Sequence, residues 1–244
     1  MPRFFVSPQQ LNRESVQILG EDARHLSKSL RMRPGEEVTV CDGAGFDYLC
    51  SIEELSPDEV RCRILSRSPS LSEPRTAVTL YQALPKGDKL DFIVQKAVEL
   101  GAAEVVPVLT RFCVSRPDER AAEKKVQRLQ KIAEEAAKQS GRGILPAVLP
   151  LHSLEQALER MRSSDLPLIC YEGGGEPFSR LLPREGVRTV SVLIGSEGGF
   201  ASEEVQAARE KGLRPVTLGR RILRCETAPI AALTAVMLLA GEME

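Results

Sequence analysis

The chain of 244 residues contains no tryptophan, and aromatic residues of all kinds make up only 4% of it. Proteins that bind single-stranded nucleic acid stack bases on aromatic side chains, so this scarcity argues against a large stacking platform. Histidine is also scarce, with two residues, and the six cysteines are scattered without a Cys-x-x-Cys pair. Because zinc sites need such closely spaced ligands, we expect no metal, and we expect free thiols in a reducing compartment.

The sequence also lacks a long apolar run and a strong net charge. No apolar segment reaches the roughly 20 residues that span a bilayer, and no signal-peptide core follows the opening MPRFFVSPQQ. We therefore expect a soluble cytoplasmic protein with no membrane partner. The formal net charge is −1, so any site for a polyanion has to be a local patch.

The first 70 residues are typical of a small β-rich domain. The runs EEVTVCDG, FDYLCSIEEL and DEVRCRILSR alternate apolar and polar residues and are divided by Gly, Pro and Asp, as half-buried antiparallel strands do. The segment SRSPSLSEP, Ser66–Pro74, is rich in Ser and Pro and has few apolar anchors, which favours a linker. We predict one domain over 1–70 and a second over 75–244.

In the second part, strands and helices are expected to alternate. The runs AVTLYQAL, EVVPVLT, LPLICYE and VSVLIG are read as strands. Leu90–Leu100 has apolar residues at helical spacing and ends at Gly101 as C-cap, a polar helix runs from about Glu119 to Gln139, and another helix has Ser202 as N-cap. This alternation predicts an α/β domain with a mostly parallel sheet, and a ligand beyond the carboxyl ends of its strands.

Three of these strand ends lead into glycine-bearing loops, CYEGGGEP, IGSEGGF and LGRRILRCETA. Glycine allows the backbone to approach a ligand closely; one such loop alone is ordinary turn chemistry, but three at successive strand ends favour a small-molecule site. None matches a phosphate-binding fingerprint, so we expect no dinucleotide or nucleoside triphosphate. The last loop precedes TAPIAALTAVMLLA, which is apolar nearly all round, as is typical of a helix buried on both sides, with Thr227 as its N-cap.

Four motifs in order carry a family resemblance: LPKGDKLDFIVQKAVELG, EEAAKQSGR, IGSEGGF and LGRRILRCETA. With RFFV and HLSKSLRMRPGE near the start, they resemble the RsmE family of ribosomal RNA methyltransferases over nearly the whole chain. Two residues depart from the family pattern: Ser196 stands where proline is usual, and Cys225 stands where threonine is commoner.

The resemblance implies a fold, a cofactor and a reaction. The expected fold is α/β: a C-terminal domain of the SPOUT superfamily with a parallel sheet and a trefoil knot, after a small N-terminal β-barrel of PUA or OB type that binds RNA. The implied enzyme is a homodimer that uses S-adenosylmethionine to methylate N3 of a uridine in small-subunit (16S) ribosomal RNA. Its implied partner is the naked ribosomal RNA or the assembled small subunit.

On this resemblance the three glycine loops are expected to hold the cofactor. The predicted cofactor-binding residues are Tyr171, Glu172, Gly173, Ile194, Gly195, Gly198, Leu218, Gly219, Ile222, Leu223, Thr227 and Ala228.

Two residues are catalytic candidates. Uracil N3 is a poor nucleophile until it loses its proton, which spreads negative charge onto the flanking carbonyl oxygens. Arg224 is the candidate to stabilise that charge, because a guanidinium can donate paired hydrogen bonds to such oxygens. Glu197 is a candidate general base if burial raises its pKa, and Glu226 could equally be an anchor that pairs with an arginine. Arg220 and Arg221 are interpreted as solvated or as phosphate contacts.

RNA contact is expected from a local positive strip, because 23–35 contains four cations and no acidic residue. The predicted RNA-binding residues are Arg3, Arg24, Lys28, Arg31, Arg33, Lys86, Lys89, Gln139 and Arg142.

Three alternatives stay open. A different transferase on the same scaffold would bind the cofactor without salt-sensitive RNA affinity, whereas an RNA-binding module without catalysis would bind no cofactor. A SPOUT methyltransferase that acts on another RNA is the third.

Overall fold

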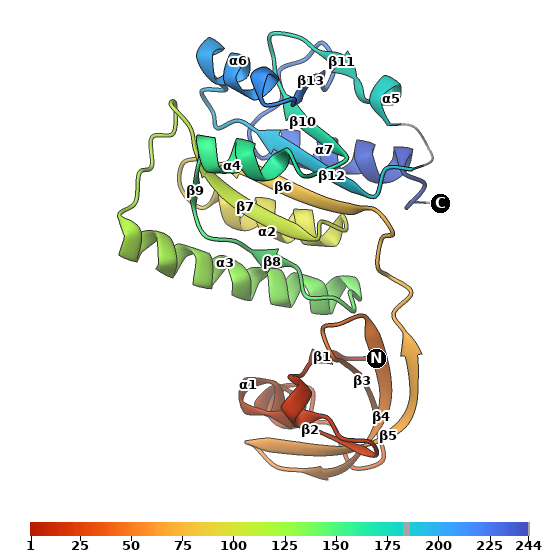
Figure 1. The fold of residues 1–244 in the computed structure, drawn as a ribbon. Helices are drawn as coiled ribbons and strands as arrows, with labels where there is room; N and C mark the ends of the chain where they lie inside the picture. Colours follow the sequence, from red (N-terminus) through yellow and green to blue (C-terminus); the bar gives the residue numbers. More distant parts are fainter. Residues whose placement is uncertain (183–185, 244) are drawn as a thin grey trace. The chain divides into compact units, whose positions relative to one another are not determined.

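The computed structural model describes residues 1–182 and 186–243, and the chain divides into two compact units (Figure 1). Unit 1 comprises Met1–Glu73 and Ala137–Leu145, and unit 2 comprises Pro74–Ala136 and Pro146–Glu244. The first division lies within the predicted linker segment. However, the last strand of unit 1 extends to Pro69, so the linker prediction is wrong for Ser66–Pro69.

Unit 1 is built on a curled five-stranded sheet (Figure 1). Its strands are β1 (Arg3–Phe5), β2 (Ser15–Leu19), β3 (Glu37–Cys41), β4 (Phe46–Leu55) and β5 (Glu59–Pro69), in the order β1-β3-β4-β5-β2. The pairs β3–β4 and β4–β5 are antiparallel, as predicted. The pair β2–β5, whose first strand was not predicted, is also antiparallel, and β1 runs parallel to β3. A short helix α1 (Gly20–Arg24) and a π-helix (His25–Ser29) follow β2, and a 3₁₀ helix (Pro8–Gln10) precedes it.

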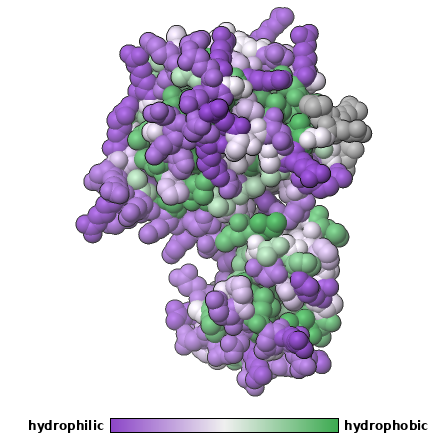
Figure 2. All heavy atoms as spheres, in the orientation of Figure 1, coloured by the Kyte–Doolittle hydropathy of each residue, from purple (hydrophilic) through white to green (hydrophobic). Residues whose placement is uncertain are grey.

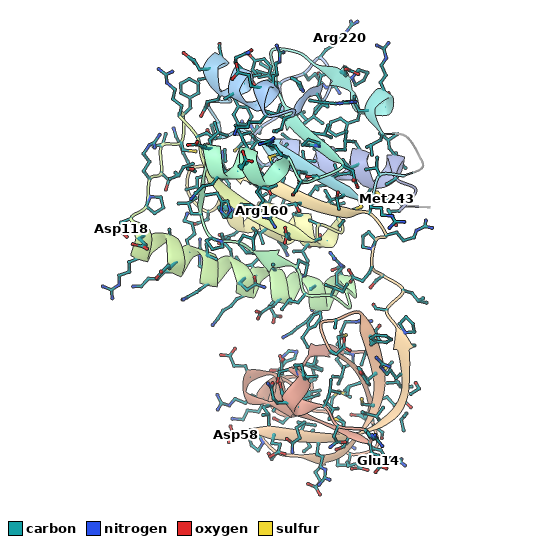
Figure 3. All side chains as sticks on the ribbon, viewed as in Figure 1. Glu14, Asp58, Asp118, Arg160, Arg220 and Met243 are labelled. Carbon is teal, nitrogen blue, oxygen red and sulfur yellow. The ribbon has the colours of Figure 1, made fainter. Side chains whose placement is uncertain are left out.

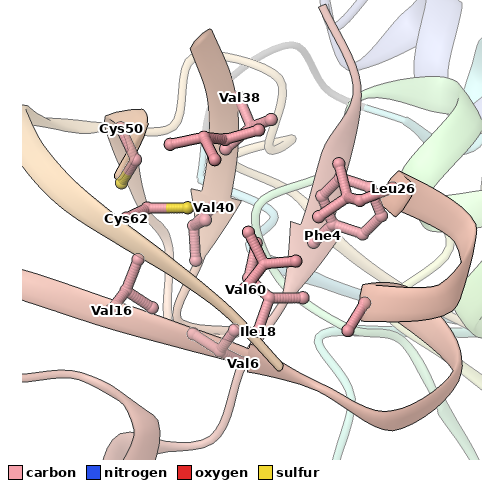
Figure 4. Packing of buried hydrophobic residues seen from close by; sticks show 12 residues of the cluster. Phe4, Val6, Val16, Ile18, Leu26, Val38, Val40, Cys50, Val60 and Cys62 are labelled. Carbon is pink, nitrogen blue, oxygen red and sulfur yellow. The ribbon is translucent and has the colours of Figure 1, made fainter. Parts of the chain in front are cut away.

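The core of unit 1 forms on the inner face of this sheet. Alternate residues of β2 and β3, such as Val16, Ile18, Val38 and Val40, are buried there (Figure 4), which is the period of two expected of half-buried strands. Cys62 lies in the same core, and burial raises the pKa of its thiol to about 11. It is therefore a small apolar core side chain and not a reactive thiolate.

The segment 137–145 is held in unit 1 by a buried ion pair. Arg142, which is 4% exposed, donates from Nη2 to Glu73 Oε2 at 2.8 Å, and the backbone N–H groups of Gly143 and Ile144 donate to Glu73 Oε1 at 2.7 and 3.0 Å. Burial alone would raise the pKa of Glu73, but these donors hold it below its ordinary value. Three such hydrogen bonds compensate the free-energy cost of burying the Glu73 carboxylate.

Unit 2 is built on an all-parallel sheet in the order β11-β13-β10-β12-β6-β7-β8, with β9 also paired to β7. The strands are β6 (Ala77–Ala83), β7 (Glu104–Leu109), β8 (Ala147–Val148), β9 (His152–Ser153), β10 (Leu166–Cys170), β11 (Glu176–Pro177), β12 (Thr189–Ile194) and β13 (Arg214–Thr217). The predicted α/β class and parallel sheet are confirmed.

Helices cover both faces of this sheet, with α4 and α6 on one face and α2 and α7 on the other (Figure 1). They are α2 (Lys89–Glu99), α3 (Glu119–Ser140), α4 (Leu154–Met161), α5 (Phe178–Leu181), α6 (Ser202–Glu210) and α7 (Thr227–Leu239). The N-cap predictions are each wrong by one residue, because Ala201 precedes α6 and Glu226 precedes α7. At α6 the Glu204 carboxylate accepts the Ala201 N–H at 2.9 Å, so the first turn is closed from within.

Helix α7 is apolar but is buried on one side only within the chain. Leu233, Val236 and Met237 are buried, whereas Leu238 is 55% exposed and Ile230 is half-buried. The single chain therefore does not bury α7 on both sides, contrary to the sequence prediction. None of the described helices is both long and apolar enough to cross a membrane. The trefoil knot stays a prediction.

Candidate active site

The three glycine-bearing loops line one cavity in unit 2. They follow β10, β12 and β13, which lie side by side in the sheet, and the cavity they enclose measures about 490 Å³. This volume falls within the ~300–1,000 Å³ typical of small-molecule sites. The predicted convergence of the loops is confirmed.

Most of the predicted cofactor residues line this cavity, and Gly173 and Thr227 do not. Both catalytic candidates, Arg224 and Glu197, are also in its wall. The sequence prediction of the site missed the following lining residues: Lys89, Cys170, Ser196, Gly199, Thr217, Arg220, Arg221 and Cys225.

Glycine is required in the loop after β12 for reasons visible in its packing. Gly199 has φ +65°, and a Cβ there would collide with the carboxylate of Glu172. A Cβ on Gly198 would lie 2.7 Å from the Cβ of Phe112, and one on Gly195 would lie 3.1 Å from the Gly199 Cα. A side chain at any of these three glycines would therefore disturb the packing of the loop against its neighbours.

One wall of the cavity holds a cluster of paired charges. Lys89, the first residue of α2, contacts Glu197 Oε1 at 2.9 Å and Glu226 Oε2 at 3.3 Å through its Nζ. The backbone N–H of Lys86 also donates to Glu197 Oε1 at 3.1 Å. The Cys225 thiol donates to Glu226 Oε2 at 3.1 Å, and burial raises the pKa of that thiol to about 12.

This cluster overturns the condition on which Glu197 was a candidate base. Burial alone would raise the pKa of Glu197, but the hydrogen bond from Lys89 and the backbone donors lower it to about 2. A carboxylate held so acidic is a weak base near neutral pH. Glu226 is indeed an anchor, but its partner is a lysine and not an arginine.

The arginines of the loop after β13, unlike the charged groups around Lys89, are not paired within the described residues. Arg220, Arg221 and Arg224 line the cavity and are exposed, and their side chains have no hydrogen bond or ion pair within the described residues. Figure 3 shows Arg220 extending from the surface of unit 2. The backbone of the loop is nevertheless fixed, because the Arg224 carbonyl accepts the N–H groups of Thr227 and Ala228, both at 2.9 Å, at the start of α7. These guanidinium groups are available to a ligand.

Comparison with known proteins gives the family. Residues 72–237 match the model of an RNA methyltransferase domain, and 18–65 match that of an RNA methyltransferase PUA domain. The chain is 36% identical to the ribosomal RNA small subunit methyltransferase E of Bacillus subtilis, over 97% of this chain and 96% of that protein. This chain belongs to the methyltransferase E family.

Solved structures of similar proteins agree with this assignment. A methyltransferase E from Neisseria gonorrhoeae bound to S-adenosyl methionine has a TM-score of 0.89 and 36% identity, covering 98% of each chain. A Legionella pneumophila protein in complex with the bound cofactor SAM has a TM-score of 0.87 and 30% identity, covering 97% of this chain and 96% of that one.

Ser196, one of the two residues expected to depart from the family pattern, has an unusual environment in the structure. It lines the cavity at 7% exposure, and its Oγ is a buried atom without a hydrogen-bond partner among the described residues. The only other such atom in the described part of the chain is Oε1 of Gln82, whose Nε2 donates to the Gly195 carbonyl at 3.2 Å.

The residues predicted to bind RNA divide into available and occupied side chains. Lys28, Arg31 and Arg33 are exposed, and their side chains have no partner within the described residues. Gln139 and Lys86 are exposed.

The other cations among these predicted residues are paired. Arg24 pairs with Asp58 at 2.9 Å on the surface. Arg3 donates to both carboxylate oxygens of Asp47, at 2.8 and 2.9 Å.

Three of the residues predicted to contact RNA form ion pairs with carboxylates of the chain. Arg142 is buried against Glu73, Arg3 is engaged by Asp47, and Lys89 lies in the cavity wall between two carboxylates. Of these three, only Arg142 is buried, at 4% exposure, whereas the Arg3 and Lys89 side chains are 18% and 34% exposed. Arg142 is therefore assigned a structural role, and RNA contact by Arg3 and Lys89 stays a prediction. No group of three or more potential metal ligands occurs among the described residues.

Proposed function

We propose that this protein transfers a methyl group from S-adenosylmethionine to N3 of a uridine in small-subunit ribosomal RNA, and that it acts as a homodimer. The observation that carries the proposal is the cavity in which three glycine loops from adjacent strands meet the unpaired Arg224. The relatives named as ribosomal RNA small subunit methyltransferase E support the substrate class.

The cavity suits the cofactor in size and charge. S-adenosylmethionine has an adenine, a sulfonium and both an ammonium and a carboxylate, and the cavity wall offers backbone groups of glycines, the carboxylate of Glu172 and three arginines. Two similar structures have this cofactor bound. When bound, the cofactor supplies an activated methyl, so the protein's task is to bind, align and handle charge.

Arg224 is the residue proposed to act on the reacting base. Its guanidinium is always charged, and no carboxylate among the described residues neutralises it. When the imide nitrogen of uracil loses its proton, the charge that develops on the two carbonyl oxygens would accept hydrogen bonds from Arg224. This lowers the free energy of the nucleophilic form.

The two carboxylates that pair with Lys89 are poor candidates to take that proton. Glu197 is ionised with a pKa of about 2, and hydrogen bonds from Cys225 and its own backbone, with Lys89, also lower the pKa of Glu226. We expect the imide proton to leave to water, and the concentration of the imide anion to limit the rate.

The positive strip of unit 1 is proposed to hold the RNA backbone. Lys28, Arg31 and Arg33 are cations without a partner among the described residues, and they lie inside the segment 18–65 that matches a PUA domain. Phosphate contacts of this kind give affinity and salt dependence without reading sequence. The target base has to be accessible to the cavity, so a splayed or flipped nucleotide is expected.

The proposed homodimer interface is the free side of α7. Ile230, Thr234 and Leu238 lie four residues apart on one side of this apolar helix, and Leu238 is 55% exposed. Much of the face of unit 2 seen in Figure 2 is hydrophilic, and a symmetric pairing through α7 would cover the apolar side chains of Ile230 and Leu238. Leu238→Glu should shift the protein from dimer to monomer in analytical ultracentrifugation.

The experiment that tests the proposed function follows a labelled methyl group. The protein is incubated with labelled S-adenosylmethionine and with either assembled small subunits or naked ribosomal RNA, and the labelled nucleotide is then located. We expect N3-methyluridine at one site. Label at another atom or in another RNA would contradict the proposal, and titration calorimetry that detects no cofactor binding would favour an RNA-binding module.

A further inference from the structure

Lys89 joins three segments of the chain at the cavity wall. It is the first residue of α2, and its Nζ lies 2.9 Å from Glu197 Oε1 in the loop after β12 and 3.3 Å from Glu226 Oε2 in the loop after β13. These two loops supply most of the cavity lining. One ammonium group is therefore shared by the two loops that shape the site.

The turn before α2 reinforces this contact. The Lys86 N–H donates to both carboxylate oxygens of Glu197, at 3.1 and 3.3 Å, so the turn 86–89 holds this side chain through a backbone and a side-chain donor. Glu226 stands two residues after Arg224, and the Arg224 carbonyl is fixed at the start of α7 by two N–H groups. The contact between Lys89 and Glu226 therefore lies within two residues of Arg224, in the same fixed turn.

The charges of the cluster make Lys89 the residue that keeps it together. Two carboxylates converge on one ammonium, and their side chains are only partly exposed, at 29% and 25%, so water screens their repulsion incompletely. If the ammonium were removed, the two loops would be pushed apart. A displacement of about 1 Å at a reacting centre can reduce turnover by about 100-fold.

We infer that Lys89 is a positioning residue of the methyl-transfer site: it binds Glu197 and Glu226 together and so aligns the glycine loop with the loop that carries Arg224. This inference rests on the proposed function. It is an alternative to the prediction that Lys89 contacts RNA.

The test compares Lys89→Met with a matched control on the same helix. Lys96 pairs with Glu99 at 2.8 Å, and the Lys96 and Lys89 side chains are 31% and 34% exposed, but Lys96 does not line the cavity. Lys89→Met should lower the affinity for S-adenosylmethionine about tenfold and turnover at saturating cofactor about 100-fold. Lys96→Met should leave both within about twofold, and Lys89→Arg should retain most of the activity.

A second substitution separates positioning by charge from a general loss of structure. In the Lys89→Met background, Glu226→Gln removes the repulsion between the carboxylates and should restore much of the cofactor affinity. In the parent protein, Glu226→Gln weakens one of the two contacts of the Lys89 ammonium, which together form the clamp Glu197–Lys89–Glu226, and should weaken cofactor binding. This reversal of sign is a coupling that simple loss of packing does not produce, and Glu226→Gln alone tests the clamp even if Lys89→Met does not fold.

Three results would overturn the inference. Lys89→Met could bind cofactor and turn over like the parent, Glu226→Gln could worsen cofactor binding equally in both backgrounds, or Lys89→Met could weaken only the RNA affinity and its salt dependence, which would make Lys89 an RNA contact. Cofactor affinity is measured by calorimetry without RNA. If the parent transferred no methyl to ribosomal RNA, the proposed function would fail while these affinities still tested the clamp.

Discussion

The two sides of the cavity handle charge in opposite ways. Around Lys89 each charged group has a partner, whereas the guanidinium groups of Arg220, Arg221 and Arg224 have none within the described residues. Paired charges fix geometry, because each would be costly to leave alone. Unpaired charges at a cavity are held ready for a ligand, so this difference separates the residues that build the site from those that act in it.

The largest expected effect comes from the unpaired side. Arg224→Ala should cost about 2.7 to 4 kcal/mol of transition-state stabilisation, which is a fall in turnover of about 100- to 1,000-fold and is the usual effect of losing one preorganised donor. The cofactor affinity should change little. Single-turnover assays and calorimetry measure the two quantities. The control is Arg209→Ala, an exposed arginine of α6 that does not line the cavity, and equal activity of both variants would remove Arg224 from the mechanism.

The pH dependence of the rate tests the paired side. Because Glu197 has its pKa lowered to about 2, the stabilisation it contributes is fully present above its unfolded pKa of ~4.3 and is lost only as pH falls toward 2. Between about pH 6 and pH 9 it does not titrate, so the rate should rise with the concentration of the imide anion. A plateau set by a group that titrates near neutrality would identify a general base and contradict this expectation.

The glycine loop between the two sides should respond to a single methyl group. Gly199→Ala places a Cβ at φ +65° and against Glu172, which should cost roughly 1–2 kcal/mol of folding free energy and also reduce cofactor affinity. Gly212→Ala is the control, since Gly212 has φ +89° but open space around it, away from the cavity. Urea denaturation should show a similar loss of unfolding free energy in both variants, because both glycines have positive φ. Only Gly199→Ala should weaken cofactor binding.

The same contrast between paired and unpaired cations extends to unit 1. Arg31→Glu should weaken RNA binding and reduce the slope of log affinity against log salt by about 1, as expected for the loss of one phosphate contact. Arg24→Glu should have a smaller effect, because Arg24 is already paired with Asp58. Filter binding at several salt concentrations measures both, and an unchanged slope for Arg31→Glu would show that the strip is only a solvated surface.

The parts of the site that could be predicted from the sequence are those governed by local chemistry. Glycines at strand ends identify loops that approach a ligand, and alternation of strands with helices brings the carboxyl ends of parallel strands together. The partners of Lys89 and Arg142 could not be predicted in this way. Glu197 is 108 residues from Lys89, and Glu73 is 69 residues from Arg142, so only the tertiary fold determines that these cations are paired.

The smallest expected effect concerns the buried hydroxyl of Ser196, which has neither an ionic partner nor a hydrogen bond among the described residues. A buried polar group without a partner costs free energy, so Ser196→Ala should leave the stability unchanged or raise it by up to about 1 kcal/mol. Ser191→Ala is the control: the Ser191 hydroxyl is bonded to that of Ser164, and its loss should destabilise the protein by about 1 kcal/mol. Urea denaturation without cofactor measures both. A fall in cofactor affinity for Ser196→Ala would show instead that this hydroxyl gains its partner from the ligand, and would place Ser196 with the unpaired arginines among the residues that act in the site.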